Sequence, residues 1–188
     1  VEISRCFVRM NTSTTTSTIM CLRKYSGTGL LNNVRIINNI FEGGYYGIQL
    51  YAGTGTGTNQ YGTNIVIDSN IIRDQYSCAT YLYYADFKSV SYNTILSRTA
   101  NTTTTWYGLR FNYCNYYANA NKVHQRANAI TNPYLIYNNY VAYYNATNRS
   151  LLSNNELMGY STTASYGIYN SYAAVDVFHN SVYMKGTG

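Results

Sequence analysis

Apolar residues recur at one fixed spacing along this chain of 188 residues. At seven places an Asn, once a Cys, follows mostly β-branched or aliphatic residues five and three positions earlier and precedes another two positions later. The seven sets are Val1/Ile3/Cys6/Val8, Val34/Ile36/Asn39/Phe41, Ile65/Ile67/Asn70/Ile72, Lys88/Val90/Asn93/Ile95, Val123/Gln125/Asn128/Ile130, Ser150/Leu152/Asn155/Leu157 and Val175/Val177/Asn180/Val182. Side chains of a strand alternate with period two, so the step of three to the Asn breaks the alternation. Each repeat is therefore predicted to hold a strand that bends at the Asn.

The recurring Asn suits such a bend, because it tolerates left-handed backbone angles and bonds nearby backbone groups. Identical Asn residues at one height in stacked coils can also pass amide hydrogen bonds from coil to coil. We therefore expect an internal ladder made of Cys6, Asn39, Asn70, Asn93, Asn128, Asn155 and Asn180. A second match, Tyr134/Ile136/Asn139/Val141, lies too close to Asn128 for a full coil. We assign it to the second face of the fifth coil, and the boundaries between Asn115 and Asn145 stay open.

A second strand is expected between successive Asn places. These strands are Ile19–Leu22, Gly47–Tyr51, Ala79–Tyr83, Gly108–Asn112, Tyr134–Asn138 and Gly167–Tyr169, with Pro133 just before one of them. Their expected inward pairs are Ile48/Leu50, Thr80/Leu82 and Leu109/Phe111. Three of them begin alike, with Tyr46-Gly-Ile, Tyr107-Gly-Leu and Tyr166-Gly-Ile. No window has the apolar spacing of a helix.

Strands that repeat in this way predict an all-β fold, a right-handed parallel β-helix of about seven coils. It forms one domain over residues 1–188, which we also read as a segment of a longer repeat protein. The pattern resembles the right-handed parallel β-helix repeat family. The stretches Tyr166-Gly-Ile-Tyr-Asn-Ser and Val175-Asp-Val-Phe-His-Asn-Ser are similar to the Asn-rich repeats of large secreted bacterial surface proteins. The resemblance implies an extracellular or cell-surface location, but the family hosts lyases, hydrolases, adhesins and structural rods alike.

Composition changes this picture in one respect. Charged residues make up 11% of the chain, well below the usual quarter, whereas Tyr occurs 24 times. The surface must therefore consist of Thr, Ser, Asn and Tyr, which suits extracellular exposure, sugar contact or packing against another copy. The net charge of +6 is spread over scattered Lys and Arg, so no nucleic-acid partner is expected. No apolar run is long enough to span a membrane.

The four cysteines form no C-x-x-C pair, which argues against zinc and thioredoxin chemistry. Cys6 takes an inward ladder place and is expected to be buried. The disulfide state of Cys6, Cys21, Cys78 and Cys114 is left open. Four glycosylation sequons lie in predicted loops, at Asn11, Asn101, Asn145 and Asn148.

No catalytic, metal or cofactor site is predicted, because the seven acidic residues do not converge on the repeat. They are Glu2, Glu42, Asp68, Asp74, Asp86, Glu156 and Asp176. Asp68, Arg73 and Asp74 come closest to a lyase-like calcium site. Arg9, Glu42 and Arg73 share one outward column, which we interpret as a charge ladder rather than a groove for a charged sugar. His124 and His179 fall on coils that are not neighbours and are expected at the surface or in turns.

Two functions remain. The first is a structural protein, a solenoid subunit that stacks end to end into a filament or forms part of a surface rod, since the repeat strands Val1–Val8 and Val175–Val182 carry no polar cap. The alternative is a carbohydrate-binding adhesin or a degenerate polysaccharide lyase or hydrolase. Tyr45, Tyr46, Trp106 and Tyr107 are its candidate sugar contacts.

Overall fold

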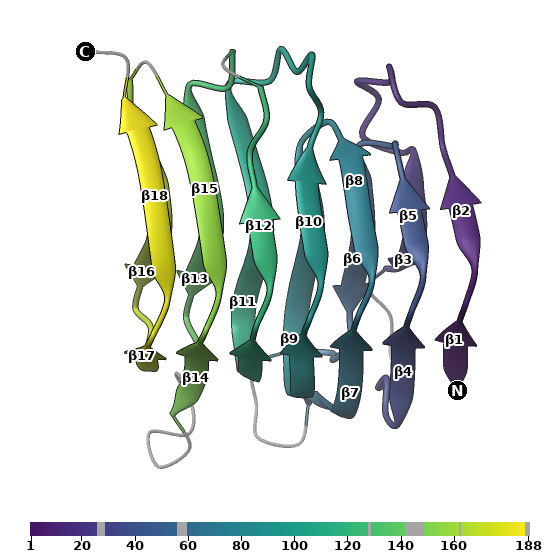
Figure 1. Ribbon diagram of the computed structural model, residues 1–188. Helices are drawn as coiled ribbons and strands as arrows, with labels where there is room; N and C mark the ends of the chain where they lie inside the picture. The colour runs from purple at the N-terminus through teal and green to yellow at the C-terminus, as the bar shows by residue number, and fades with distance from the viewer. Residues whose placement is uncertain (26–28, 56–59, 128, 142–148, 162, 187–188) are drawn as a thin grey trace.

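The chain folds into a parallel β-solenoid in which strands of successive turns lie side by side (Figure 1). The computed structural model describes residues 1–25, 29–55, 60–127, 129–141, 149–161 and 163–186. Every regular element in this part of the chain is a β-strand. The predicted all-β fold and parallel stacking are confirmed. The stack has about six turns instead of seven coils, because seven ladder places enclose only six intervals.

Each turn contributes strands to three faces, which we number. The first face holds β1 (Glu2–Ser4), β4 (Val34–Ile37), β7 (Gly62–Asp68), the later parts of β9 (Cys78–Ser91) and β11 (Thr105–Asn119), β14 (Ser150–Ser153) and β17 (Val175–Phe178). The second face holds β2 (Phe7–Arg9), β5 (Ile40–Glu42), β8 (Ile71–Gln75), β10 (Thr94–Ser97), β12 (Lys122–His124), β15 (Glu156–Ser161) and β18 (Ser181–Gly186). The third face holds β3 (Met20–Lys24), β6 (Tyr46–Tyr51), the earlier parts of β9 and β11, β13 (Asn132–Asn139) and β16 (Tyr166–Ser171).

The predicted second strands correspond to the third face, and each overlaps an observed strand. Pro133 is the second residue of β13 rather than the residue before it. The expected inward pairs are all buried, which confirms the side of the sheet that faces the core. That core is a continuous column of Ile, Leu, Val and Phe side chains that runs along the solenoid. No helix in the described ranges is long and apolar enough to cross a lipid bilayer.

The corner between the first and second faces depends on the residue just before each ladder place. That residue has a positive φ before all seven ladder places, with φ between 52° and 58°: Arg5, Asn38, Ser69, Tyr92, Ala120, Asn154 and His179. Such left-handed angles cost an L-residue about 1–2 kcal/mol. The sequence suggested that the ladder Asn itself has the left-handed angle, but the residue before it does. The ladder Asn side chain instead ties down the corner that its neighbour turns.

The glycines of the three Tyr-Gly motifs let the third face approach the second. A Cβ atom on Gly47 would lie 2.7 Å from Ile72 Cγ2, and one on Gly167 would lie 2.5 Å from Val182 Cγ1. A Cβ on Gly108 would contact Val123 Cγ1 and lie 2.5 Å from the Leu135 carbonyl oxygen. In each case the approaching side chain stands two residues after a ladder Asn. The two repeated sequence motifs therefore meet across the core.

Candidate functional site

The predicted amide ladder runs along the corner between the first and second faces. An interior amide such as Asn70 forms bonds to three turns. Its Oδ1 accepts hydrogen bonds from the backbone N–H and the Nδ2 of Asn39, both at 3.0 Å. Its Nδ2 donates to Asn93 Oδ1 at 3.1 Å and to the Ile36 carbonyl at 2.8 Å. Because Asn70 is fully buried, this network satisfies polar groups that would otherwise be costly inside the core.

The fifth place of the ladder belongs to Asn121, which corrects the prediction of Asn128. Asn93 donates to Asn121 Oδ1 from its backbone N–H at 3.0 Å and from its Nδ2 at 2.9 Å. Asn121 Nδ2 then donates to Asn155 Oδ1 at 2.9 Å. Residue 128 itself lies outside the described residues.

The repeat pattern missed Asn121 because of the residues that precede it. Tyr116 and Ala118 stand five and three positions before Asn121, and both are buried although neither is β-branched. Val123 stands two positions after it and pairs with Ile95 and Leu157, the equivalent residues of the neighbouring turns. Val123 is therefore the part of the repeat pattern that marks this ladder place in the sequence.

Cys6 takes the first place of the ladder but is exposed, which corrects the prediction of a buried thiol. Its backbone N–H donates to Asn39 Oδ1 at 2.9 Å, as an Asn would. Its thiol donates to the Ser4 carbonyl at 3.3 Å. Cys6 therefore continues the ladder with its backbone but offers no amide oxygen.

The four candidate sugar contacts do not form one surface. Trp106 has no exposed surface and lies in the core, so it cannot reach a ligand in this structure. Tyr45 packs on Tyr46 with ring centroids 4.7 Å apart. Tyr46 and Tyr107 are half-buried in the outer layer of the third face. Sequence alone did not separate the inward Trp from the outward Tyr beside it.

The tyrosines of the third face stack from turn to turn. Tyr107, Tyr134 and Tyr166 form one row, with centroids 5.1 and 4.6 Å apart and ring planes within 15° of parallel. Tyr137 and Tyr169 begin another, 5.2 Å apart at 7°. Stacked rings cover each other's faces and present their edges and hydroxyl groups outward. The interior of each row is therefore unsuited to stacking on a sugar ring, which needs an open aromatic face.

A second stack marks the corner between the third and first faces. Tyr84, Tyr113, Tyr140 and Tyr172 occupy successive turns there, all with positive φ near 50°. The last two pairs are almost parallel, with centroids 4.7 and 5.0 Å apart. Aromatic contact of this kind contributes about 0.5–1.5 kcal/mol per pair, which offsets the backbone cost of the corner.

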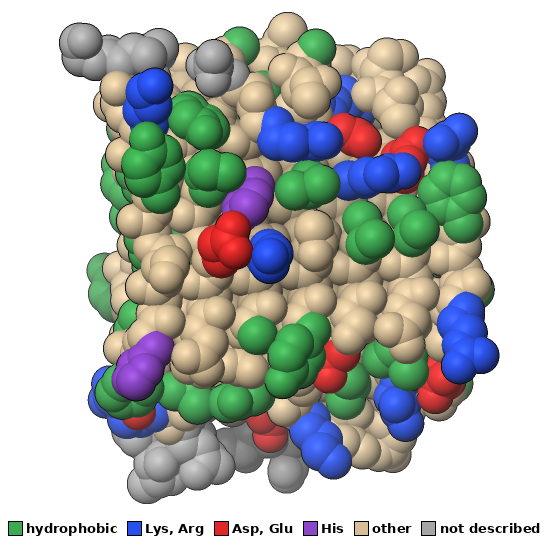
Figure 2. Space-filling view, viewed as in Figure 1, with side chains coloured by type: hydrophobic (Ala, Val, Ile, Leu, Met, Phe, Trp, Pro, Cys, Tyr) green, Lys and Arg blue, Asp and Glu red, His purple; other side chains and the backbone are tan. Residues whose placement is uncertain are grey.

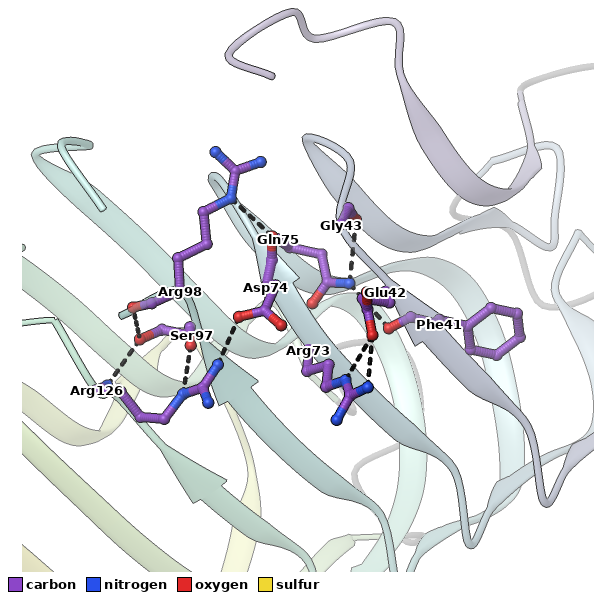
Figure 3. Close-up of polar contacts among 9 residues, drawn as sticks. All are labelled: Phe41, Glu42, Gly43, Arg73, Asp74, Gln75, Ser97, Arg98 and Arg126. Carbon is purple, nitrogen blue, oxygen red and sulfur yellow. Dashed lines mark hydrogen bonds and ion pairs between the residues drawn. The ribbon is translucent and has the colours of Figure 1, made fainter. Parts of the chain in front are cut away.

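The acidic residues do not converge on a metal or catalytic site. Among the described residues, no three His, Cys, Asp or Glu side chains lie close enough to hold a metal ion. Asp68 accepts hydrogen bonds from Ser89 Oγ at 2.8 Å and the Ser91 N–H at 2.7 Å. Asp74 instead forms an ion pair with Arg126 at 2.6 Å (Figure 3). Asp86 is on the first face, where burial raises the pKa of its carboxyl group.

The neighbours of Asp74 are buried polar side chains that join adjacent turns. Arg98 donates to the Asp74 carbonyl at 2.7 Å and to the Gly44 carbonyl at 3.0 Å. Gln75 Nε2 donates to the carbonyls of Phe41 and Gly43 at 3.1 and 3.2 Å (Figure 3). These contacts close the edge of the second face and serve the fold.

The column of Arg9, Glu42 and Arg73 is confirmed as a charge ladder. The three residues pair across β2, β5 and β8. The Glu42 carboxylate lies 2.6 Å from Arg9 and 2.5 Å from Arg73. Figure 2 shows the same arrangement on the outside of the second face, where acidic side chains lie beside basic ones.

The electrostatics of Glu42 predict a pH-dependent contribution to stability. Burial alone raises the pKa of its carboxyl group, but hydrogen bonds from Arg73 and Arg9 outweigh burial, and the pKa lies below the ordinary value of 4.5. A lowered pKa in the folded state means stability that is complete above pH 4.5 and disappears as the pH falls through the folded pKa.

We expect Glu42→Gln to lower the free energy of unfolding by about 1 kcal/mol at pH 7, a value reduced for the solvent exposure of both arginines. Urea unfolding at pH 7 and pH 3 should show the difference shrink at the lower pH. The exposed Glu156→Gln is the matched control and should change stability by less. A loss for Glu42→Gln that is equal at both pH values would contradict the assignment.

The two histidines lie apart, as expected. His124 Nε2 is 2.8 Å from Glu156 Oε1 on the second face. His179 is an exposed corner residue of the last turn.

Two of the four glycosylation candidates can be placed. Asn11 is exposed, and its Oδ1 accepts hydrogen bonds from Ser13. Asn101 is 2% exposed, and its Nδ2, the atom that would carry the glycan, donates to the Tyr76 carbonyl at 2.8 Å. The structure therefore argues against Asn101 as a glycan acceptor. Asn145 and Asn148 lie outside the described residues.

All four cysteines are free thiols. Burial raises the pKa of Cys21 to about 11 and the pKa of both Cys78 and Cys114 to about 12. The thiolate is the reactive form, so these three should react slowly.

We expect a maleimide at pH 7 to modify Cys6 quickly in the native protein and all four cysteines in urea. Mass spectrometry of tryptic peptides measures both. Cys6→Ser is the control and should leave the native protein essentially unlabelled over the same period. Fast native labelling of Cys78 or Cys114 would show that the core of the solenoid opens.

The first face carries a surface groove of about 660 Å³. It is lined by Asn33, Arg35, Asn64, Val66, Asp68, Lys88, Ser89 and Tyr117. Amides, charges and an exposed tyrosine ring are groups that bind saccharides. Of these residues, only Asp68 was a candidate functional residue from the sequence, and Lys88 was expected only as part of a repeat strand.

The geometry defines a class of protein, a parallel β-solenoid with an internal asparagine ladder. No protein-family model, curated protein or solved structure matches the chain.

Proposed function

We propose that this chain is an extracellular structural protein, a solenoid unit that stacks end to end into a filament or forms one stretch of a cell-surface rod. The proposal includes the resemblance to Asn-rich repeats of bacterial surface proteins. It rests on one observation. Residues that are buried in interior turns are exposed at both ends of the described stack.

The last turn illustrates this exposure. Val177 and Val182 are 41% and 47% exposed, whereas Leu152 and Leu157, their partners in the turn before, are 0% and 1% exposed. At the other end Val1 is 86% exposed, whereas Val34, which stands in the same register in the next turn, is 5% exposed. Another coil, from a second copy or from a longer chain, would bury these side chains and gain roughly 25 cal/mol per Å² of apolar surface.

The hydrogen bonds between turns supply a register for such stacking. In the interior, the residue after each ladder place donates its N–H to the ladder carbonyl of the preceding turn, as Ile40 does to Cys6 and Ser181 to Asn155, at 2.9 and 2.8 Å. The equivalent bond between two copies joins Phe7 N–H to the Asn180 carbonyl. At this junction Cys6 would provide no amide oxygen for Asn180, so the junction is weaker than an interior step.

The experiment follows from that weak step. Cys6→Asn completes the ladder across the junction and should lower the concentration at which filaments form, whereas Val182→Lys should abolish them without unfolding the protein. Sedimentation velocity and negative-stain electron microscopy measure both. A protein that stays monomeric at high concentration, with or without Cys6→Asn, would refute end-to-end assembly.

A carbohydrate-binding adhesin, or a degenerate polysaccharide-processing helix, is the second candidate. The groove on the first face favours it, because its amides and charges can bond sugar hydroxyls and acidic groups. A glycan array with Lys88→Gln as the groove variant tests this function. Absence of any retained glycan argues against it.

A further inference from the structure

Arg110 interrupts a row of aromatic residues on the third face. The row consists of Gln49, Tyr81, Arg110, Tyr137 and Tyr169, which occupy the same register in five successive turns. The Arg110 guanidinium carbon lies 4.3 Å from the Tyr81 ring centroid and 5.3 Å from that of Tyr137. Tyr107, on the same strand, is 4.5 Å away. The guanidinium therefore stands where the neighbouring turns place a ring.

Arg110 has no carboxylate partner. All seven acidic residues of the chain are among the described residues, and five of them form ion pairs with other cations. Asp68 is bonded by Ser89 and Ser91 on the first face. Asp86 pairs in register with Asn115, five residues beyond Arg110, or about 16 Å along the strand. A largely buried cation without a counter-ion is unusual, because burying a charge is costly unless it is paired.

Buried polar atoms near Arg110 provide a second observation. Three buried polar atoms there have no hydrogen-bond partner among the residues that the structure describes: Arg110 Nε, Asn112 Nδ2 and Gln49 Oε1. Asn112 and Gln49 are 2% and 5% exposed, and Asn112 is the next outward residue of the strand that carries Arg110. Two of the three atoms are donors. Unpartnered buried donors beside an unpaired guanidinium favour a ligand that accepts hydrogen bonds and carries negative charge.

The hydroxyl groups around Arg110 suit the same ligand. Burial raises the pKa of Tyr46 to about 12 and also raises the pKa of Tyr107, so both phenols are protonated donors at neutral pH. The rings cover the guanidinium, which leaves its edge for planar, bidentate contact with an oxyanion. The rows repeat along the solenoid with the ~4.8 Å spacing of strands, which favours an extended polymer over a compact ligand.

We propose that Arg110 and the tyrosine edges around it form a binding site for the carboxylate or sulfate groups of an acidic polysaccharide. Recognition depends on charge and hydrogen bonds rather than on sugar stacking, because the ring faces are already covered. The site is on the third face, separate from the end faces used for stacking and from the groove of the first face. It therefore goes beyond the proposed function and can fail independently of it.

The decisive variant is Arg110→Tyr, which removes the cation but restores the residue that adjacent turns carry at this position. Lys122→Gln, at an exposed position of the second face, is the control with the same change in net charge. Binding is measured by titration calorimetry at 150 mM NaCl with four probes: heparin, which is sulfated, polygalacturonate, which is carboxylated, dextran, which is neutral, and single-stranded DNA, which is a polyanion without sugar acids. Thermal unfolding of each variant checks the fold.

We expect the wild type to bind at least one acidic polymer and not dextran, and the preferred polymer identifies the sulfate or the carboxylate as the ligand group. Arg110→Tyr should lose affinity at least tenfold with unchanged thermal unfolding, and Lys122→Gln less than twofold. Arg110→Lys should lose severalfold, because an ammonium group cannot make the bidentate contact.

Three outcomes overturn the site: no binding of either acidic polymer by the wild type, equal binding of dextran, or wild-type affinity in Arg110→Tyr. Tighter binding of single-stranded DNA than of both glycans would assign the face to a different polyanion and also reject the proposal.

Discussion

Asn121→Ala is expected to lower the free energy of unfolding by about 3–5 kcal/mol, a large part of the 5–15 kcal/mol typical of a domain. The substitution removes the acceptor of two Asn93 donors and leaves the Val90 carbonyl without the Asn121 Nδ2 donor that lies 2.8 Å from it. Because Asn93 and Asn121 are fully buried, water cannot replace these bonds. Urea unfolding followed by circular dichroism measures the loss.

Two further variants define the origin of that loss. Asn180→Ala removes the same kind of acceptor at the end of the ladder, where Asn180 itself is partly exposed to solvent, and should cost about 1–2 kcal/mol. Asn128→Ala tests the placement that the sequence favoured and should have little effect on the ladder. A larger loss for Asn128→Ala than for Asn121→Ala would show that the ladder passes through residue 128.

Gly108→Val is expected to destabilise the protein by more than 3 kcal/mol, and Gly108→Ala by about 2–3 kcal/mol. Even a single Cβ at this position would contact Val123 Cγ1 and lie 2.5 Å from the Leu135 carbonyl oxygen. The side chain could move, but the backbone carbonyl belongs to the next strand of the sheet and cannot shift alone. Thermal and urea unfolding both measure the effect.

Gly29→Ala is the matched control, because a Cβ at residue 29 meets nothing within 4 Å. Its effect should stay within about 0.5 kcal/mol. Adding Val123→Ala to Gly108→Ala should recover about 1 kcal/mol relative to the sum of the single losses, since only the side-chain part of the clash is relieved. Full additivity would mean that Gly108 and Val123 do not meet across the core.

Much of the fold was predictable because it repeats. Six of the seven ladder places, the inward pairs and the strands of the third face follow from period-two alternation and from Asn at a fixed offset. The failure at Asn121 has a local reason. Tyr116 and Ala118 replace the usual β-branched residues before it. Both are buried, and the ring of Tyr116 stacks on the ring of Phe111 in the core. The repeat pattern recognises β-branched residues at fixed positions, whereas the core can be filled by any side chains of suitable total volume.

The candidate sites were less predictable. Adjacent residues such as Trp106 and Tyr107 have similar chemistry, but one is in the core and the other is outside, because successive side chains of a strand point to opposite faces of the sheet. Likewise Arg110 looks like one of many scattered cations in the sequence. Only its position between Tyr81 and Tyr137, contributed by strands of the neighbouring turns, separates it from the arginines that have carboxylate partners.

The sequence by itself therefore determined the class of fold, the parallel stacking and the existence of an amide ladder, because these depend on spacing along one chain. The tertiary structure decided which Asn fills the fifth place, which residue turns each corner, which aromatic side chains face out, and that Arg110 lies between aromatic rings rather than beside a carboxylate. Those properties depend on the register between turns that are 23 to 34 residues apart. The variable loops between turns hide that register from any local pattern.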